Sequence, residues 1–178
     1  FCENNIGRSQ AFINLLFPII QEFFPGQMKG ISAQNLFSEI NFIEPSFIRT
    51  EADELTYHYH IMIRYEIEKK LINNELKVSD VREYWNAMYK QYLKIDVPND
   101  AHGCLQDVHW SFGGMGYFPT YSLGSFFAAQ WYLEMNKKQD LKDLILQKKF
   151  NQINDWHSVH IHQYGALYNS DELCVKAT

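Results

Sequence analysis

One stretch of the sequence, residues 103–121, is unlike any packed helix and constrains the fold more than the rest. It reads GCLQDVHWSFGGMGYFPTY. Gly113, Gly114 and Gly116 let the backbone turn sharply or approach a ligand closely, because they lack a Cβ atom. A loop that combines such glycines with groups that bind or move protons favours a functional site over a connector. The alternative is a β-hairpin or an Ω-loop whose aromatic side chains cap the core. The proton-binding side chains are Asp107, His109, Tyr117 and Tyr121.

The rest of the chain shows apolar residues at helical spacings, separated by turn signals. We therefore expect an all-α fold, with a small loop or β-hairpin near 104–118 as the only β structure. No repeat or linker divides the chain, so residues 1–178 are predicted to form a single all-α piece, a helical bundle that makes one side of a deep groove. The expected helices cover residues 1–24 (kinked at Pro18), 32–41, 50–71, 78–93, 120–137, 140–164 and 170–178.

Composition and charge exclude several classes of protein. A net charge of -5 without a basic run argues against nucleic-acid binding. The apolar stretches are interrupted well short of about 18 residues, so we expect no membrane span. No segment reads as a signal peptide, and Cys2, Cys104 and Cys174 are typical of reduced thiols in a cytoplasmic protein. The chain begins at Phe1 and stops at Thr178 inside an expected helix, so we expect a piece of a larger protein.

The histidines do not predict a metal site. His58 and His60 are two residues apart, and on a helix such side chains point about 200° apart, so they cannot share one ion. His157 and His160 do share a face, but a third ligand would have to come from elsewhere. We interpret them, with His162, as polar groups of a helix surface or a cleft. We expect no metal in this chain.

Three sequence blocks match a known family. GCLQDVHW is followed by GYFPTYSLG, residues 48–57 read IRTEADELTY, and the chain starts with ENNIGRSQAF after two residues. Together they resemble the thermostable carboxypeptidase Taq family, the all-helical zinc carboxypeptidases with an HExxH motif. The residues that fit the family pattern in the glycine-rich stretch are Gly103, Gln106, Asp107, His109, Trp110, Gly116, Tyr117, Phe118, Pro119, Tyr121 and Gly124.

The resemblance implies that the chain is the C-terminal part of a metallopeptidase domain that removes single residues from peptide C-termini. The family's HExxH and HES segments are absent, so the ligands of the zinc would lie outside this chain. Arg49 is implied to bind the terminal carboxylate of the peptide, for which a planar guanidinium is well suited. From the residues alone, Arg49 would instead pair with Glu51, Asp53 or Glu54.

The resemblance also suggests roles within the glycine-rich stretch. We expect Tyr117 to donate its hydroxyl to the tetrahedral oxyanion. His109 would donate to the same centre or to the substrate backbone. Gln106 and Asp107 would orient the loop or His109, and Tyr121 would line the substrate pocket.

Two further hypotheses stay open. The chain could be a non-catalytic helical interaction module whose loop tyrosines and histidines bind a partner. It could also form a homodimer through its apolar first helix. The 178-residue chain by itself is expected to be inactive as a peptidase, because it has no HExxH motif and no substitute set of three ligands.

Overall fold

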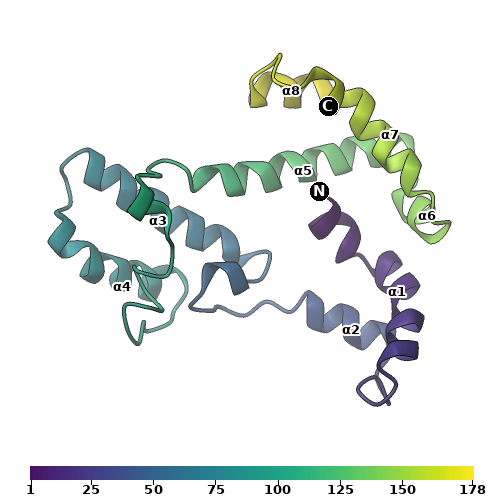
Figure 1. Ribbon diagram of the computed structural model, residues 1–178, viewed down its shortest axis with the longest axis horizontal. Helices are drawn as coiled ribbons and strands as arrows, with labels where there is room; N and C mark the ends of the chain where they lie inside the picture. The colour runs from purple at the N-terminus through teal and green to yellow at the C-terminus, as the bar shows by residue number, and fades with distance from the viewer. The chain divides into compact units, whose positions relative to one another are not determined.

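The computed structural model describes all residues 1–178 and contains helices and loops without any strand. The prediction of an all-α fold is thus confirmed. The helices, labelled in Figure 1, are α1 (Gln10–Phe23), α2 (Ala33–Ile40), α3 (Thr56–Ile72), α4 (Val81–Tyr92), α5 (Pro119–Lys138), α6 (Leu141–Leu146), α7 (Phe150–His160) and α8 (Ser170–Ala177).

The chain divides into two compact units. One consists of residues 1–41 and 125–178, and the other of residues 42–124. Each unit has a hydrophobic core of its own, as described below. The division falls within the residues of α5, whose first turns belong to the second unit and whose remainder belongs to the first.

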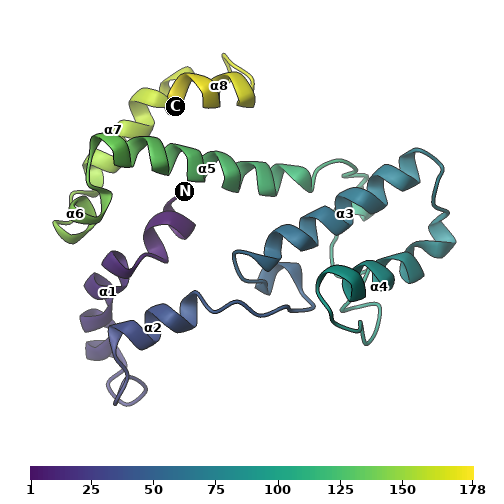
Figure 2. The same ribbon diagram turned by 180° about the vertical axis from the view of Figure 1, so that it is seen from behind.

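The first unit packs α1, α2, α6, α7 and α8 with most of α5 (Figure 2). Met135, Leu141 and Trp156 lie at its core, and each is almost fully buried. The expected helix over residues 1–24 is divided, because the Ser9 side chain accepts a hydrogen bond from the backbone N–H of Phe12 and starts α1 there. Before it, Cys2–Gly7 form a short π-helix. Pro18 lies inside α1, as predicted.

In the second unit α3 and α4 lie side by side, as both ribbon views show. Their shared core contains Ile63, Ile67, Trp85, Tyr89 and Leu93. Two of these residues, Trp85 and Tyr89, stack at 5.1 Å between ring centroids. This core supports the loop that follows α4 and carries the glycine-rich stretch.

The start of α3 differs from the predicted one. Thr50 lies in a short 3-10 helix, Arg49–Glu51, and α3 begins only at Thr56. The Asp53 carboxylate accepts from the backbone N–H groups of Leu55 and Thr56, and from the Thr56 hydroxyl. Asp53 therefore caps the helix, because its carboxylate satisfies N–H groups that have no intrahelical partner.

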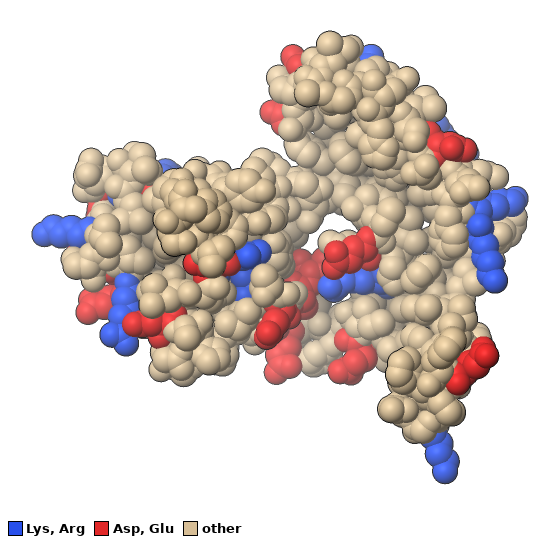
Figure 3. Space-filling model, viewed as in Figure 1, with Lys and Arg blue, Asp and Glu red and all other residues tan.

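The surface carries both signs of charge. On the face shown in Figure 3, acidic and basic side chains are interspersed, without a continuous basic patch. None of the helices combines the length and the hydropathy that a membrane crossing requires.

Candidate active site

The glycine-rich stretch folds as a loop with one turn of 3-10 helix, His109–Phe112, and without β pairing. Of the two predicted alternatives near 104–118, the structure contains the loop. Gly113 ends the 3-10 turn with a φ of 79°, and Gly116 has a φ of 77°. These left-handed conformations are ones that glycine adopts without the steric cost of a Cβ atom. The predicted turn function of these glycines is borne out by the backbone.

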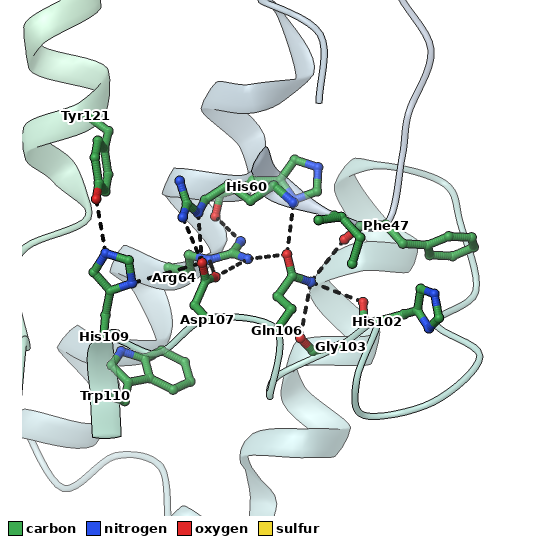
Figure 4. Close-up of polar contacts among 12 residues, drawn as sticks. Phe47, His60, Arg64, His102, Gly103, Gln106, Asp107, His109, Trp110 and Tyr121 are labelled. Atoms are coloured by element: carbon green, nitrogen blue, oxygen red, sulfur yellow. Dashed lines mark hydrogen bonds and ion pairs between the residues drawn. The ribbon is translucent and has the colours of Figure 1, made fainter. Parts of the chain in front are cut away.

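Asp107 lies between two arginines at the start of this loop (Figure 4). Its Oδ1 accepts from Nε and Nη2 of Arg49 at 3.0 and 2.8 Å, and its Oδ2 accepts from Nε of Arg64 at 2.6 Å. Burial acts to raise the pKa of Asp107, but the charge of Arg64 and the hydrogen bonds from both arginines outweigh it and lower the pKa. Asp107 is therefore a stable carboxylate within the cluster.

Arg49 keeps part of its binding capacity. It donates two hydrogen bonds to Asp107 and one, from Nη1, to the Tyr57 hydroxyl at 3.1 Å. A guanidinium carries five N–H groups, so two of them have no acceptor in the chain. The ring of Tyr121 lies 5.1 Å from the guanidinium carbon, and that of Phe118 lies 5.6 Å away. Arg49 is thus a buried cation among aromatic rings with donors to spare.

The charges of this cluster do not cancel. Two guanidinium groups, Arg49 and Arg64, face the single carboxylate of Asp107. The nearby His60 is neutral, because burial lowers its pKa to about 3 and the charges of Arg64 and Arg49 act in the same direction. Among the ion-paired groups the two guanidinium charges exceed the single carboxylate charge, so an anion that reached Arg49 would be attracted to it.

Gln106 connects the loop to the rest of the unit. Its Oε1 accepts from the backbone N–H of Arg49 at 2.9 Å and from Nη2 of Arg64 at 2.8 Å. Its Nε2 lies within hydrogen-bond distance of the Phe47 carbonyl and of the Tyr89 hydroxyl (Figure 4). Gln106 thus holds both arginines through one oxygen, an arrangement that fits an orienting role.

His109 lies beside Asp107 and points toward α5. Its Nε2 is 3.1 Å from the Tyr121 hydroxyl (Figure 4). The ring of His109 lies 5.7 Å from that of Tyr117. Its Nδ1 is buried without a hydrogen-bond partner, 4.0 Å from Asp107 Oδ1. Tyr117 is half exposed. The structure therefore brings all six predicted site residues into one unit: Arg49, Gln106, Asp107, His109, Tyr117 and Tyr121.

Several interactions of these residues differ from the predicted ones. Arg49 pairs with Asp107, which lies 58 residues away, and not with an acidic residue near the start of α3. Arg64 is fully buried, and it was not among the predicted site residues. The sequence alone does not distinguish a buried arginine in an apolar helix from one whose charged end reaches solvent. The only available signal was its position between Ile63 and Ile67, one turn after His60. His60 itself bonds to the Tyr89 hydroxyl at 2.9 Å.

The three histidines near the end of α7 do not assemble a metal site. The Nδ1 atoms of His157 and His160 lie 2.8 Å from the carbonyl oxygens of Ile153 and Trp156. His162 follows in a short 3-10 helix, His162–Tyr164. No group of three histidine, cysteine, aspartate or glutamate side chains in residues 1–178 is arranged to hold a metal ion. The residues of this chain therefore do not fit a zinc site of their own.

The second unit is thus all-helical and contains a buried arginine–carboxylate cluster beside a histidine and two tyrosines. The family model described as "Carboxypeptidase Taq (M32) metallopeptidase" matches residues 1–178. The chain belongs to this family of metallopeptidases, which confirms the resemblance found in the sequence.

Individual relatives agree with this assignment. The chain is 47% identical to carboxypeptidase 1 of Bacillus subtilis over 166 residues, covering 93% of this chain and 33% of that protein. It is 37% identical to thermostable carboxypeptidase 1 of Pyrococcus furiosus, covering 99% of this chain and 36% of that protein. The crystal structure of a carboxypeptidase from Deinococcus radiodurans matches with a TM-score of 0.95 and 35% identity, covering 99% of this chain and 36% of the other. The chain thus spans about a third of the length of its relatives.

Proposed function

We propose that this chain is the substrate-binding part of a zinc-dependent carboxypeptidase that removes single residues from peptide C-termini. Family membership supports the peptidase class. The observation that carries the substrate-binding role is Arg49, a buried guanidinium with two N–H groups that no acceptor in the chain uses. A carboxylate is the anion that this planar fork binds in a two-bond geometry. Recognition of a terminal carboxylate would restrict cleavage to the ends of peptides.

The residues of this chain have separate roles in the proposed reaction. Arg49 binds the terminal carboxylate, while Gln106 and Asp107 hold Arg49 in place. Tyr117, which is half exposed, donates its hydroxyl to the oxyanion of the tetrahedral intermediate. His109 donates a further hydrogen bond to the same centre or to the substrate backbone, and Tyr121 orients His109 through the bond to Nε2 while lining the pocket.

The zinc of the complete protein is part of the same proposal. We infer from the family that its ligands come from segments outside this chain, and that this chain corresponds to the C-terminal part of the longer relatives. The chain alone is then inactive. We place the protein in the cytoplasm, with peptide C-termini as partners. The exposed apolar side chains of α1, Ile19 and Phe23, support association into a homodimer, which light scattering would detect.

A comparison of two substrates tests the central claim without any mutation. The complete protein that contains this chain should release the last residue of a peptide with a free C-terminal carboxylate. It should leave the same peptide untouched when the C-terminus is an amide, because the amide has no charge for Arg49 to bind. Equal cleavage of both peptides would overturn the assignment of a carboxylate site.

Substitution of Arg49 tests which residue binds the carboxylate. Arg49→Lys keeps the charge and loses the planar fork, so KM should rise about 10- to 100-fold, the value of one or two hydrogen bonds to a charged group. Arg82→Lys is the matched control, because Arg82 is exposed and pairs with Asp100 at the surface. An unchanged KM in Arg49→Lys would assign the carboxylate to another residue.

The hydroxyl donor is tested in the same way. Tyr117→Phe should lower kcat about 100- to 1000-fold with a small effect on KM, as expected for a donor that acts in the transition state. Tyr59→Phe, on α3, serves as the control, because Tyr59 stacks on Tyr92 and lies outside the proposed site. A normal kcat for Tyr117→Phe would exclude Tyr117 as the oxyanion donor.

A further inference from the structure

Glu68 is a buried carboxylate without a cation. It lies on α3, one turn after Arg64, and its exposed fraction is only 3%. No lysine, arginine or histidine forms an ion pair with it. Burying a charged group costs free energy unless its oxygen atoms are satisfied by donors. The position therefore calls for an explanation beyond packing, since a leucine would fill an apolar core at lower cost.

Both oxygens of Glu68 accept from the glycine-rich loop. Oε1 accepts from the indole N–H of Trp110 at 2.8 Å, and Oε2 accepts from the backbone N–H of Gly116 at 3.0 Å. Trp110 directly follows His109, and Gly116 directly precedes Tyr117. One carboxylate on a rigid helix thus holds the loop at the two residues that adjoin the proposed proton donors.

The loop has little other support between these two points. Its internal hydrogen bonds are short-range: the N–H groups of Ser111, Gly113, Gly114 and Met115 donate to the carbonyls of Val108, Trp110, His109 and Gly113, respectively. The side chain of Phe112 is 67% exposed and adds little packing. A glutamine at position 68 would replace one of the two oxygens by an NH2 group, which is itself a donor and would face one of the two loop donors, so the carboxylate suits both of them.

We propose that Glu68 is a positioning residue, which fixes the distance between His109 and Tyr117 by clamping the loop on both sides of its turn. The proposal rests on the proposed function, because it assigns Glu68 a role in that reaction. Glu68 does not touch the substrate. It acts through Trp110 and Gly116, which adjoin His109 and Tyr117. The positions of these two side chains must be precise, because a displacement of about 1 Å can lower the rate about 100-fold.

Kinetics of the complete protein test the catalytic part of the proposal. Glu68→Gln retains one acceptor and Glu68→Leu retains none, so kcat should fall in both, about 100-fold for Glu68→Leu and less for Glu68→Gln. KM should stay close to that of the parent protein, because Arg49 is held by other residues. The control is Glu66→Gln on the same helix, because the side chain of Glu66 forms no hydrogen bond or ion pair. This substitution should leave both constants unchanged.

Hydrogen exchange measured by NMR tests the clamp independently of activity. In Glu68→Gln, the exchange of the Trp110 indole N–H or the Gly116 amide should accelerate at least about tenfold, the effect of one hydrogen bond of about 1.4 kcal/mol. Unchanged exchange at both groups would overturn the clamp, and faster exchange with a normal kcat would overturn the positioning role. If the parent protein releases no C-terminal residues, the proposed function fails, and the catalytic role of Glu68 fails with it. The exchange data would still show whether Glu68 clamps the loop. Glu68→Gln keeps the test valid if Glu68→Leu does not fold.

Discussion

At the scale of single residues, Asp107 determines whether two buried arginines can share one site. Arg64 is fully buried and Arg49 nearly so, and both direct their N–H groups at the Asp107 carboxylate. Asp107→Asn would leave two buried cations without a countercharge. We expect it to lower the free energy of unfolding by about 3–5 kcal/mol.

Urea unfolding followed by circular dichroism measures the effect of Asp107→Asn. The control is Asp96→Asn, because Asp96 forms an exposed pair with Lys90 and such pairs contribute little. A loss no larger than that of the control would show that Asp107 is not the electrostatic centre of the cluster.

His60 gives the second unit a pH dependence. Its pKa in the folded state is lowered to about 3 by burial and by the neighbouring arginines, against 6.5 for an ordinary histidine. The unfolded chain therefore binds more protons between these two values, so stability should fall as the pH falls from 6.5 toward 3, by about 1.4 kcal/mol per pH unit. Lowering the pH through the depressed pKa of Asp107 removes further stability.

Unfolding by urea at several pH values measures this dependence. His60→Gln replaces the titrating ring by a neutral amide, so the slope between pH 6.5 and 4 should become smaller even if the variant is less stable overall. An identical slope in the parent and the variant would contradict the assignment to His60.

At the scale of elements, the start of α3 depends on Asp53. Its carboxylate accepts from two backbone N–H groups of the first turn. Asp53→Ala should destabilise the second unit by about 1–2 kcal/mol, the usual cost of losing an N-terminal cap. Thr50→Ala provides the comparison, because Thr50 precedes the helix and does not cap it. Equal losses in thermal unfolding for the two variants would contradict the cap at Asp53.

Replacing glycine by alanine should change the stability in opposite directions in the glycine-rich loop and in α5. Gly116 has a φ of 77°, and Gly124 lies inside α5 with an ordinary helical conformation; an added Cβ would meet no atom within 4 Å at either. Gly116→Ala should destabilise by about 1–2 kcal/mol through backbone strain alone. Gly124→Ala should stabilise by up to about 1 kcal/mol, because alanine is the better helix former. Thermal unfolding measures both, and a stabilising Gly116→Ala would contradict the left-handed loop.

At the scale of the whole molecule, the two units have separate cores and the chain offers no group of three metal ligands. We therefore expect elemental analysis to find no zinc held tightly by this chain. Under the proposed function, the complete protein should contain about one equivalent of zinc. His157→Ala with His160→Ala is the control for adventitious binding at α7. Stoichiometric metal in the parent chain that this double substitution removes would show that the histidines form a site.

The sequence by itself determined the helical class and most of the helices, and it proposed six site residues whose roles stay predictions. Apolar periodicity and turn signals depend on neighbours a few residues apart, and the site residues lie in sequence blocks that identify the family. The sequence did not determine which residues cap the helices, because other polar residues near Ser9 and Asp53 are also suited to a cap.

Only the tertiary structure decided the partners of these residues. Asp107 reaches Arg49 and Arg64 across 58 and 43 positions, and Glu68 reaches Trp110 and Gly116 across 42 and 48. No local pattern encodes such distances, because they follow from the packing of α3 against α4 and the loop after it. Whether a charged residue is solvated or buried with a partner depends on that packing, so Arg64 and Glu68 could be recognised only in the folded chain.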